Sequence, residues 1–168
     1  MRKLTLIELL LGVAALALGT LVYVIDRPPG ETALPDSINL YGTLPALFGA
    51  IGQSFPAFAH IFAFSLLTAA CLGNGRYVAV GACTTWLLVD TAFELGQHPS
   101  LAPYVAVAVP EWFQQIPILG RATGYFLNGT FDPWDLAAIF AGTLAAYATL
   151  TFITQRSVDR APEARSIN

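Results

Sequence analysis

Charged residues are scarce in this chain. Only 11% of the 168 residues are Asp, Glu, Lys or Arg, against about 25% in soluble domains. Hydrophobic residues make up 55%, and the mean hydropathy is +0.61. Eight Lys and Arg residues, a net charge of −3 and no basic stripe leave nothing to attract a nucleic-acid backbone. This scarcity excludes an ordinary water-soluble globule and a nucleic-acid-binding protein, and it predicts an integral membrane protein.

Residues that carry reactive or metal-binding chemistry are also few. The chain has two Cys and two His, and it lacks the C-x-x-C, H-E-x-x-H and G-x-S-x-G patterns. Cys71 and Cys83 are expected to be small core residues with no disulfide between them. One alternative is a metal site formed by Asp90, Glu94 and His98 at successive fourth positions, with His60 as a further ligand. We favour no metal and no cofactor.

Four apolar runs are long enough to cross a membrane, since about 20 helical residues cover a ~30 Å hydrocarbon core. We predict one membrane domain of residues 1–168, with spans at about 4–25, 54–72, 77–97 and 133–154. The first run could instead be a cleaved signal peptide. Its length exceeds a typical signal-peptide core and favours a retained anchor. The polar tail, residues 155–168, is predicted to be disordered.

The segment of residues 101–119 is apolar, yet it contains Pro103, Pro110 and Pro117. A fifth span is possible there, but the distribution of basic residues argues against it. Four spans place most basic residues on one side (Arg2, Lys3, Arg76, Arg156, Arg160 and Arg165) and leave Arg27 and Arg121 on the other. We therefore predict an all-α, four-helix protein of the bacterial inner membrane, with cytoplasmic termini and an interfacial or re-entrant segment between the third and fourth helices.

Polar residues inside the predicted spans mark a candidate site, because each ionisable group there costs about 2.5–3.5 kcal/mol on insertion scales. His60 and Asp90 lie at matched depths, and we expect them to be within hydrogen-bonding or single-water distance of each other. Asp90, Glu94 and Gln97 share one helix face at i, i+4, i+7 spacing. His60 could instead donate a single interhelical hydrogen bond, and Glu94 and Gln97 could simply be solvated.

The last predicted span carries a stripe of small residues that would let another helix approach closely, formed by Asp135, Ala138, Gly142, Ala146 and Thr149. We predict an outward-facing polar pocket lined by His60, Asp90, Glu94, Gln97 and Asp135, with Arg121 as a nearby cation. Asp132 and Asp135 have an ordinary alternative role at the helix start. Glu8, near the cytoplasmic end of the first span, is expected to snorkel.

Several of these residues resemble the short motifs of the VanZ-like family, small bacterial membrane proteins named after a member linked to teicoplanin resistance. The similarity runs from about Phe55 to Tyr147 and includes H-x-F-x-F (His60, Phe62, Phe64) and E-x-x-Q (Glu94, Gln97). It continues with Arg121 and with D-x-x-x-x-x-x-G (Asp135, Gly142). More than twenty residues separate Gln97 from Arg121 here, a longer interval than in the family pattern. The resemblance implies a small membrane protein and no particular reaction.

Three functions are compatible with these observations. The first is an inner-membrane protein whose pocket binds a lipid-linked or cell-envelope ligand, with Arg121 for a phosphate or carboxylate. Glu94, Gln97 and Asp135 would then orient hydroxyl or amide groups above His60 and Asp90. The second is a non-catalytic accessory subunit whose partners are other membrane proteins. The third is an intramembrane enzyme acting on a lipid phosphate, with Glu94 or Asp90 as base.

Overall fold

Four long helices form the main body of the computed structural model, which describes residues 3–28, 36–73, 75–116 and 119–159. They are α1 (Lys3–Asp26), α2 (Ile51–Leu72), α3 (Arg76–Gly96) and α6 (Pro133–Asp159). Each contains a stretch long and apolar enough to cross a membrane, and no strand occurs in the described ranges. The predicted all-α fold with four potential transmembrane helices is confirmed and is consistent with a multi-pass membrane protein.

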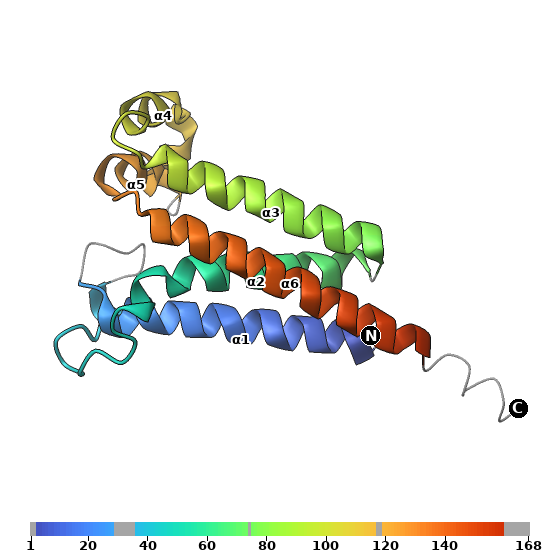
Figure 1. Ribbon diagram of the computed structural model, residues 1–168. Helices are drawn as coiled ribbons and strands as arrows, with labels where there is room; N and C mark the ends of the chain where they lie inside the picture. The colour runs from blue at the N-terminus through green and yellow to red at the C-terminus, as the bar shows by residue number, and fades with distance from the viewer. Residues whose placement is uncertain (1–2, 29–35, 74, 117–118, 160–168) are drawn as a thin grey trace, which may run out of the picture.

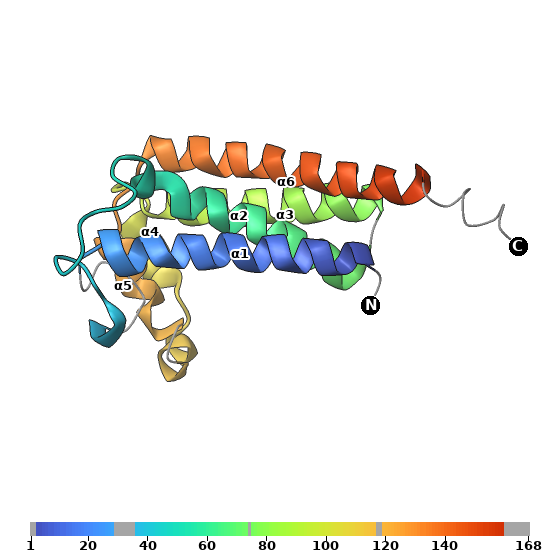
Figure 2. The same cartoon turned by 90° about the horizontal axis from the view of Figure 1, so that it is seen from below.

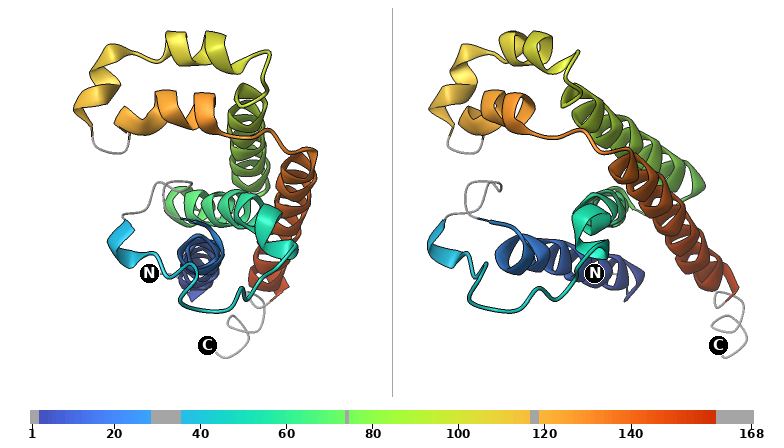
Figure 3. Two further views of the ribbon diagram at one scale, coloured as in Figure 1. Left: turned by 90° about the vertical axis from the view of Figure 1, so that its left-hand side faces the viewer. Right: turned by 60° about the vertical axis from the view of Figure 1, so that its left-hand side comes forward.

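The long helices lie side by side, with the first turn of α1 and the last turn of α6 at the same end of the bundle (Figures 1 and 2). We call this the terminal end. The opposite end, the loop end, carries the connection between α1 and α2 with the short η1 (Asp36–Ile38), and the short helices α4 (Ala102–Ala108) and α5 (Ala122–Asn128). Seen from the loop end, α4 and α5 extend to one side of the bundle (Figure 3).

The proline-containing segment between α3 and α6 does not form a fifth span. It folds into α4, the 3-10 helices η2 (Glu111–Gln115) and η3 (Leu119–Arg121), and α5. Among the described residues of this segment, which leave out 117–118, no helix is longer than seven residues, far fewer than the roughly 20 that a membrane requires. Pro103 sits in the first turn of α4, and Pro110 precedes η2 in extended backbone, so these prolines lie where helices begin. An interfacial or re-entrant position in a membrane remains a prediction.

The observed helix bounds lie close to the predicted spans, with one notable difference at α6. This helix continues to Asp159, past the predicted end at Thr154, so the beginning of the predicted disordered tail is helical. Arg156 provides a physical reason, since a cation in the last turn favours the helix C-terminus and its guanidinium carbon lies 4.2 Å from the centre of the Phe152 ring. Residues 160–168 lie outside the described ranges.

Helix α2 is the central helix of the bundle, packing against α1, α3 and α6. Small residues permit these close approaches. On α1, Gly12 lies against Leu67 and Gly19 against Ala59. On α6, Gly142 lies so close to α2 that a methyl group there would come within 2.5 Å of Ile61 Cγ2. The predicted small-residue seam is therefore confirmed at Gly142.

Two smaller predictions need correction. Cys83 is buried in the cluster where α2, α3 and α6 meet, but Cys71 is exposed instead of lying in the core. Glu8 does not snorkel, since only 1% of it is exposed. It lies four residues before Gly12 and so shares the α1 face that packs against α2.

Candidate functional site

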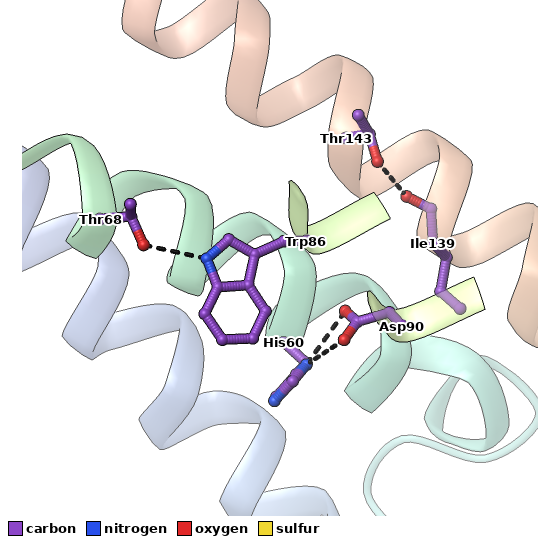
Figure 4. Close-up of polar contacts among 6 residues, drawn as sticks. All are labelled: His60, Thr68, Trp86, Asp90, Ile139 and Thr143. Atoms are coloured by element: carbon purple, nitrogen blue, oxygen red, sulfur yellow. Dashed lines mark hydrogen bonds and ion pairs between the residues drawn. The ribbon is translucent and has the colours of Figure 1, made fainter. Parts of the chain in front are cut away.

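His60 and Asp90 form a direct pair between α2 and α3, as the matched depths predict (Figure 4). His60 Nδ1 lies 3.0 Å from both carboxylate oxygens of Asp90. The Asp90 side chain is 9% exposed, whereas the His60 side chain is 46% exposed at the side of the bundle. The carboxylate is thus buried with a partner, and the far side of the imidazole reaches the surface.

Aromatic rings hold the His60 ring in place. Its centroid lies 4.4 Å from that of Phe64 and 5.9 Å from that of Trp86, in tilted and edge-on contacts. Trp86 is itself fixed, because its Nε1–H donates a 2.9 Å hydrogen bond to Thr68 Oγ1 (Figure 4). On α6, Thr143 bonds only back to the Ile139 carbonyl of its own helix in the same view. The pair is therefore held by α2 and α3.

Glu94 connects the end of α3 to the start of α6. It is 6% exposed, and its Oε1 accepts a 2.8 Å hydrogen bond from the backbone N–H of Asp132. The Asp132 carboxylate in turn accepts the backbone N–H of Trp134 at 2.9 Å, which confirms its role at the helix start. Glu94 is therefore buried and bonded, and the alternative of simple solvation is wrong for this residue.

Gln97, at the C-terminal end of α3, is 8% exposed and contacts α5 and the residue that follows it. Its side-chain oxygen lies directly against Gly129, where a Cβ atom would collide with it. The Tyr125 hydroxyl is hydrogen-bonded to the Gln97 amide. Tyr125 as a whole is 46% exposed, yet partial burial of its hydroxyl, with a further contribution from the negative charge of Glu94, raises the pKa of Tyr125 to about 12.

Asp135 lies in the first turn of α6 and is hydrogen-bonded to the Ser54 hydroxyl at the start of α2. Its Oδ1 atom is buried and has no hydrogen-bond partner. Arg27 is the cation that interacts electrostatically with Asp135, and Tyr23 also lies within electrostatic range of Asp135 and Glu94. One carboxylate oxygen of Asp135 is thus not used in hydrogen bonding at the start of α6.

These side chains form one connected group near the loop end. We call it the loop-end polar cluster, and its members are Ser54, Asp90, Glu94, Gln97, Tyr125 and Asp135. It brings together four of the six predicted site residues, and His60 adjoins it through Asp90. Arg121 is exposed on η3, and the charges acting on Glu94 are those of Asp135 and Asp132. Arg27, whose charge acts on Asp135, therefore fits the predicted role of a cation near the site better than Arg121 does.

The loop-end polar cluster adjoins a surface groove, to which Ser54 is the member that contributes a lining side chain. Neither of two surface grooves in the described part of the chain is lined by His60, Asp90, Glu94, Gln97 or Asp135. One groove of about 550 Å³ lies beside the cluster, between the loop ends of α2 and α6, and includes Ser54. The predicted residues therefore converge, while the adjoining cavity is formed by others.

The described residues do not form the alternative metal site of Asp90, Glu94, His98 and His60. Among the described residues, no group of three or more His, Cys, Asp or Glu side chains is arranged to hold a metal ion. His98 stacks edge-on against Phe131 and accepts the backbone N–H of Ser100 at 3.3 Å.

Sequence reasoning missed Tyr125, Ser54 and Arg27. A depth comparison could have found two of them, since Ser54 begins one span and Arg27 follows another at the same predicted face of the membrane as Asp135. No such signal pointed to Tyr125, which lies in a short helix between spans. Comparisons with known protein families, curated proteins and solved structures find no match for this chain.

Proposed function

We propose that this chain is a VanZ-like protein of the bacterial inner membrane that binds the headgroup of a lipid-linked or cell-envelope ligand at the loop-end polar cluster. In this proposal the terminal end is cytoplasmic and the loop end faces outward. The distribution of basic residues supports this orientation, with Arg76 and Arg156 at the terminal end and Arg27 and Arg121 at the loop end. The family assignment rests on the motif residues, of which Glu94, Gln97 and Asp135 converge.

The observation that carries the proposal is the buried Asp135 Oδ1 atom without a hydrogen-bond partner. Asp90 is paired with His60, and Glu94 ties α6 to α3, so both have a structural use. Asp135 bonds to Ser54, which leaves one carboxylate oxygen unused. A buried acceptor of this kind is costly unless a donor satisfies it. A hydroxyl or ammonium group of a ligand would be such a donor.

The charges of the cluster restrict the ligand. Asp90, Glu94, Asp135 and the neighbouring Asp132 are acceptors when ionised, so the cluster favours groups that donate hydrogen bonds. Arg27 lies at the edge and donates a 2.7 Å hydrogen bond to the Gln53 carbonyl. A headgroup with amino or hydroxyl groups facing the carboxylates, and a phosphate facing Arg27, matches this arrangement.

A direct test is to purify the full chain in a mild detergent and to identify retained lipids by mass spectrometry. The informative variants are Glu94→Gln and Asp135→Asn, which keep an oxygen acceptor for Asp132 N–H and Ser54. We expect about tenfold less retained lipid, because a hydrogen bond to a charged group contributes about 1.5–3 kcal/mol. Glu111→Gln, at an exposed position on η2, is the matched control. Equal retention by the parent and both cluster variants would exclude the proposal.

One observation favours the second candidate, an accessory subunit of a membrane complex. Nearly half of the His60 side chain is exposed at the side of the bundle, where a partner helix could bond to the free ring nitrogen. Stoichiometric co-purification of another membrane protein with the parent chain, lost in His60→Phe and retained in Asp135→Asn, would support this function over ligand binding.

A further inference from the structure

The groove beside the loop-end polar cluster has the size of a ligand site. It is an open groove with a volume of about 550 Å³, within the range of about 300–1,000 Å³ that small-molecule sites occupy. Its walls are the first turns of α2 and of α6, together with the residue before each of these helices. The lining residues are Ala50, Ile51, Gln53, Ser54, Phe55, Phe58, Asp132, Trp134, Ala137, Ala138 and Ala141.

The two walls differ in a way that keeps the groove open. The α6 wall consists largely of alanines, which leave space. The α2 wall contains Phe55 and Phe58, which belong to a stacked series with Phe48 and Phe62. Successive ring centroids in this series are 6.4, 6.0 and 5.9 Å apart. Because each ring rests on its neighbours, the α2 wall is held in shape.

The groove has a closed end and an open end. At Gly142, one residue past the last lining alanine, α6 lies against Phe58 and Ile61 of α2, so no space continues between the helices. From Trp134 to Ala141 the groove therefore extends about 10 Å along α6, at ~1.5 Å per residue. In a membrane this direction leads from the interface into the hydrocarbon layer.

The open end is polar and acidic. Gln53, Ser54 and Asp132 line it, and Ser54 is hydrogen-bonded to Asp135 of the cluster. Asp132 is only partly buried, so its charge acts on whatever occupies the opening. The apolar groove and the partly buried Asp135 carboxylate are thus joined through one serine.

We infer that this groove holds a hydrocarbon chain of an outer-leaflet lipid whose headgroup carries an amine. The inference deepens the proposed function and rests on it. An ammonium group at the opening would face Asp132 and the Ser54–Asp135 pair, which are complementary in charge and in hydrogen bonding. The chain would lie between the phenylalanines of α2 and the alanines of α6, away from the other lipids.

The dimensions favour a lipid chain over a partner helix. A partner helix is about 10 Å wide, and α6 and α2 already meet at Gly142, so such a helix could not continue along the groove. An extended hydrocarbon chain is much narrower.

The test uses the full chain in phosphatidylcholine vesicles that contain a lipid with a photoactivatable group in its acyl chain. Two probes differ only in the headgroup, phosphatidylethanolamine with an amine and phosphatidylglycerol without one. We expect cross-links to peptides of residues 51–58 and 134–141, with stronger labelling by the amine-bearing probe. Labelling spread evenly over the four long helices, or equal labelling by both probes, would overturn the inference.

Variants that fill the groove make the test specific. Ala138→Leu and Ala141→Leu should each reduce groove labelling about fivefold or more, since overfilling a site costs enough free energy for such a change. Ala141 is exposed, so leucine there does not disturb the packed core. Ala148→Leu is the matched control, an exposed alanine of the same helix outside the groove. Unchanged labelling in both groove variants would overturn the inference.

The outcomes separate this inference from the proposed function. If Asp135→Asn releases lipid while Ala141→Leu leaves the cross-linking pattern intact, the chain lies elsewhere and headgroup binding stands. If Ala141→Leu removes the cross-links while Asp135→Asn and Glu94→Gln retain the parent's lipids, the groove is the chain site and headgroup binding at the cluster is excluded.

Discussion

The contact between α6 and α2 at Gly142 predicts that alanine at this position lowers the stability of the protein. This is the opposite of the usual effect of replacing glycine by alanine within a helix. A Cβ atom at this position would lie 2.5 Å from Ile61 Cγ2 and 2.7 Å from the Phe58 carbonyl oxygen. Ile61 is fully buried, and the carbonyl belongs to the α2 backbone, so neither can move aside easily. Gly142→Ala should therefore force the two helices apart.

The expected magnitude follows from two opposing effects. Replacing glycine by alanine within a helix normally stabilises it by about 1 kcal/mol. Overpacking a closely packed contact costs about 1–3 kcal/mol, and contact with the backbone places this site at the upper end. We expect Gly142→Ala to be destabilising by about 1–2 kcal/mol, and Gly142→Leu by more. For a chain of this size, 1 kcal/mol corresponds to a shift in Tm of about 2–4 °C.

The assay is thermal unfolding in detergent, followed by size-exclusion chromatography of the fraction that remains folded. Gly81→Ala on α3 is the matched control, because nothing lies within 4 Å of its added Cβ and its Tm should stay level or rise. Leu144→Ala, at a 54% exposed position on α6, should change Tm little. If Gly142→Ala is as stable as Gly81→Ala, the two helices do not touch there and the reasoning is refuted.

Three further predictions concern other parts of the molecule. With the native cysteines replaced, Ser100→Cys should react with an impermeant reagent from outside intact cells and Ser166→Cys only after permeabilisation; the reverse pattern contradicts the orientation. In a double-mutant cycle, His60→Ala and Asp90→Ala should be non-additive by about 0.5–3 kcal/mol, because either change alone leaves its partner unpaired; additive losses would mean that the pair does not form in solution. Ultraviolet titration, with Tyr125→Phe as the difference reference, should show a tyrosine that ionises near pH 12. Since folding raises the pKa of Tyr125, its contribution to stability should be present below pH 10 and lost as the pH rises from 10 toward 12.

Hydropathy and helical spacing predicted much of the fold and part of the site. Apolar runs located the four long helices, and the matched depths of His60 and Asp90 along their helices predicted that these two residues pair. Helical periodicity placed Asp90, Glu94 and Gln97 on one buried face. Each of these inferences needs only distances along a single helix, or the requirement that spans share one membrane.

The remainder depends on how separate elements pack, which periodicity does not contain. The Ser54–Asp135 contact and the groove exist because α6 lies beside α2, a choice of neighbours that the sequence left open. Tyr125 reaches Gln97 because α5 folds back over the end of α3. Glu8 was misjudged for the same reason, since closeness to a helix end suggested access to water while packing on α2 removes it.

The central position of α2 has a consequence for the order of assembly. Helices α1 and α2 are consecutive, so they can pair through Gly12 and Gly19 as soon as both have left the ribosome. Helix α6 is synthesised last, yet it must settle against a helix that emerged some eighty residues earlier. Until then the α2 surface around Phe58 and Ile61 stays uncovered in the bilayer. Synthesis in chain order therefore predicts an interval in which the central helix is only partly enclosed, and closure at Gly142 would end that interval.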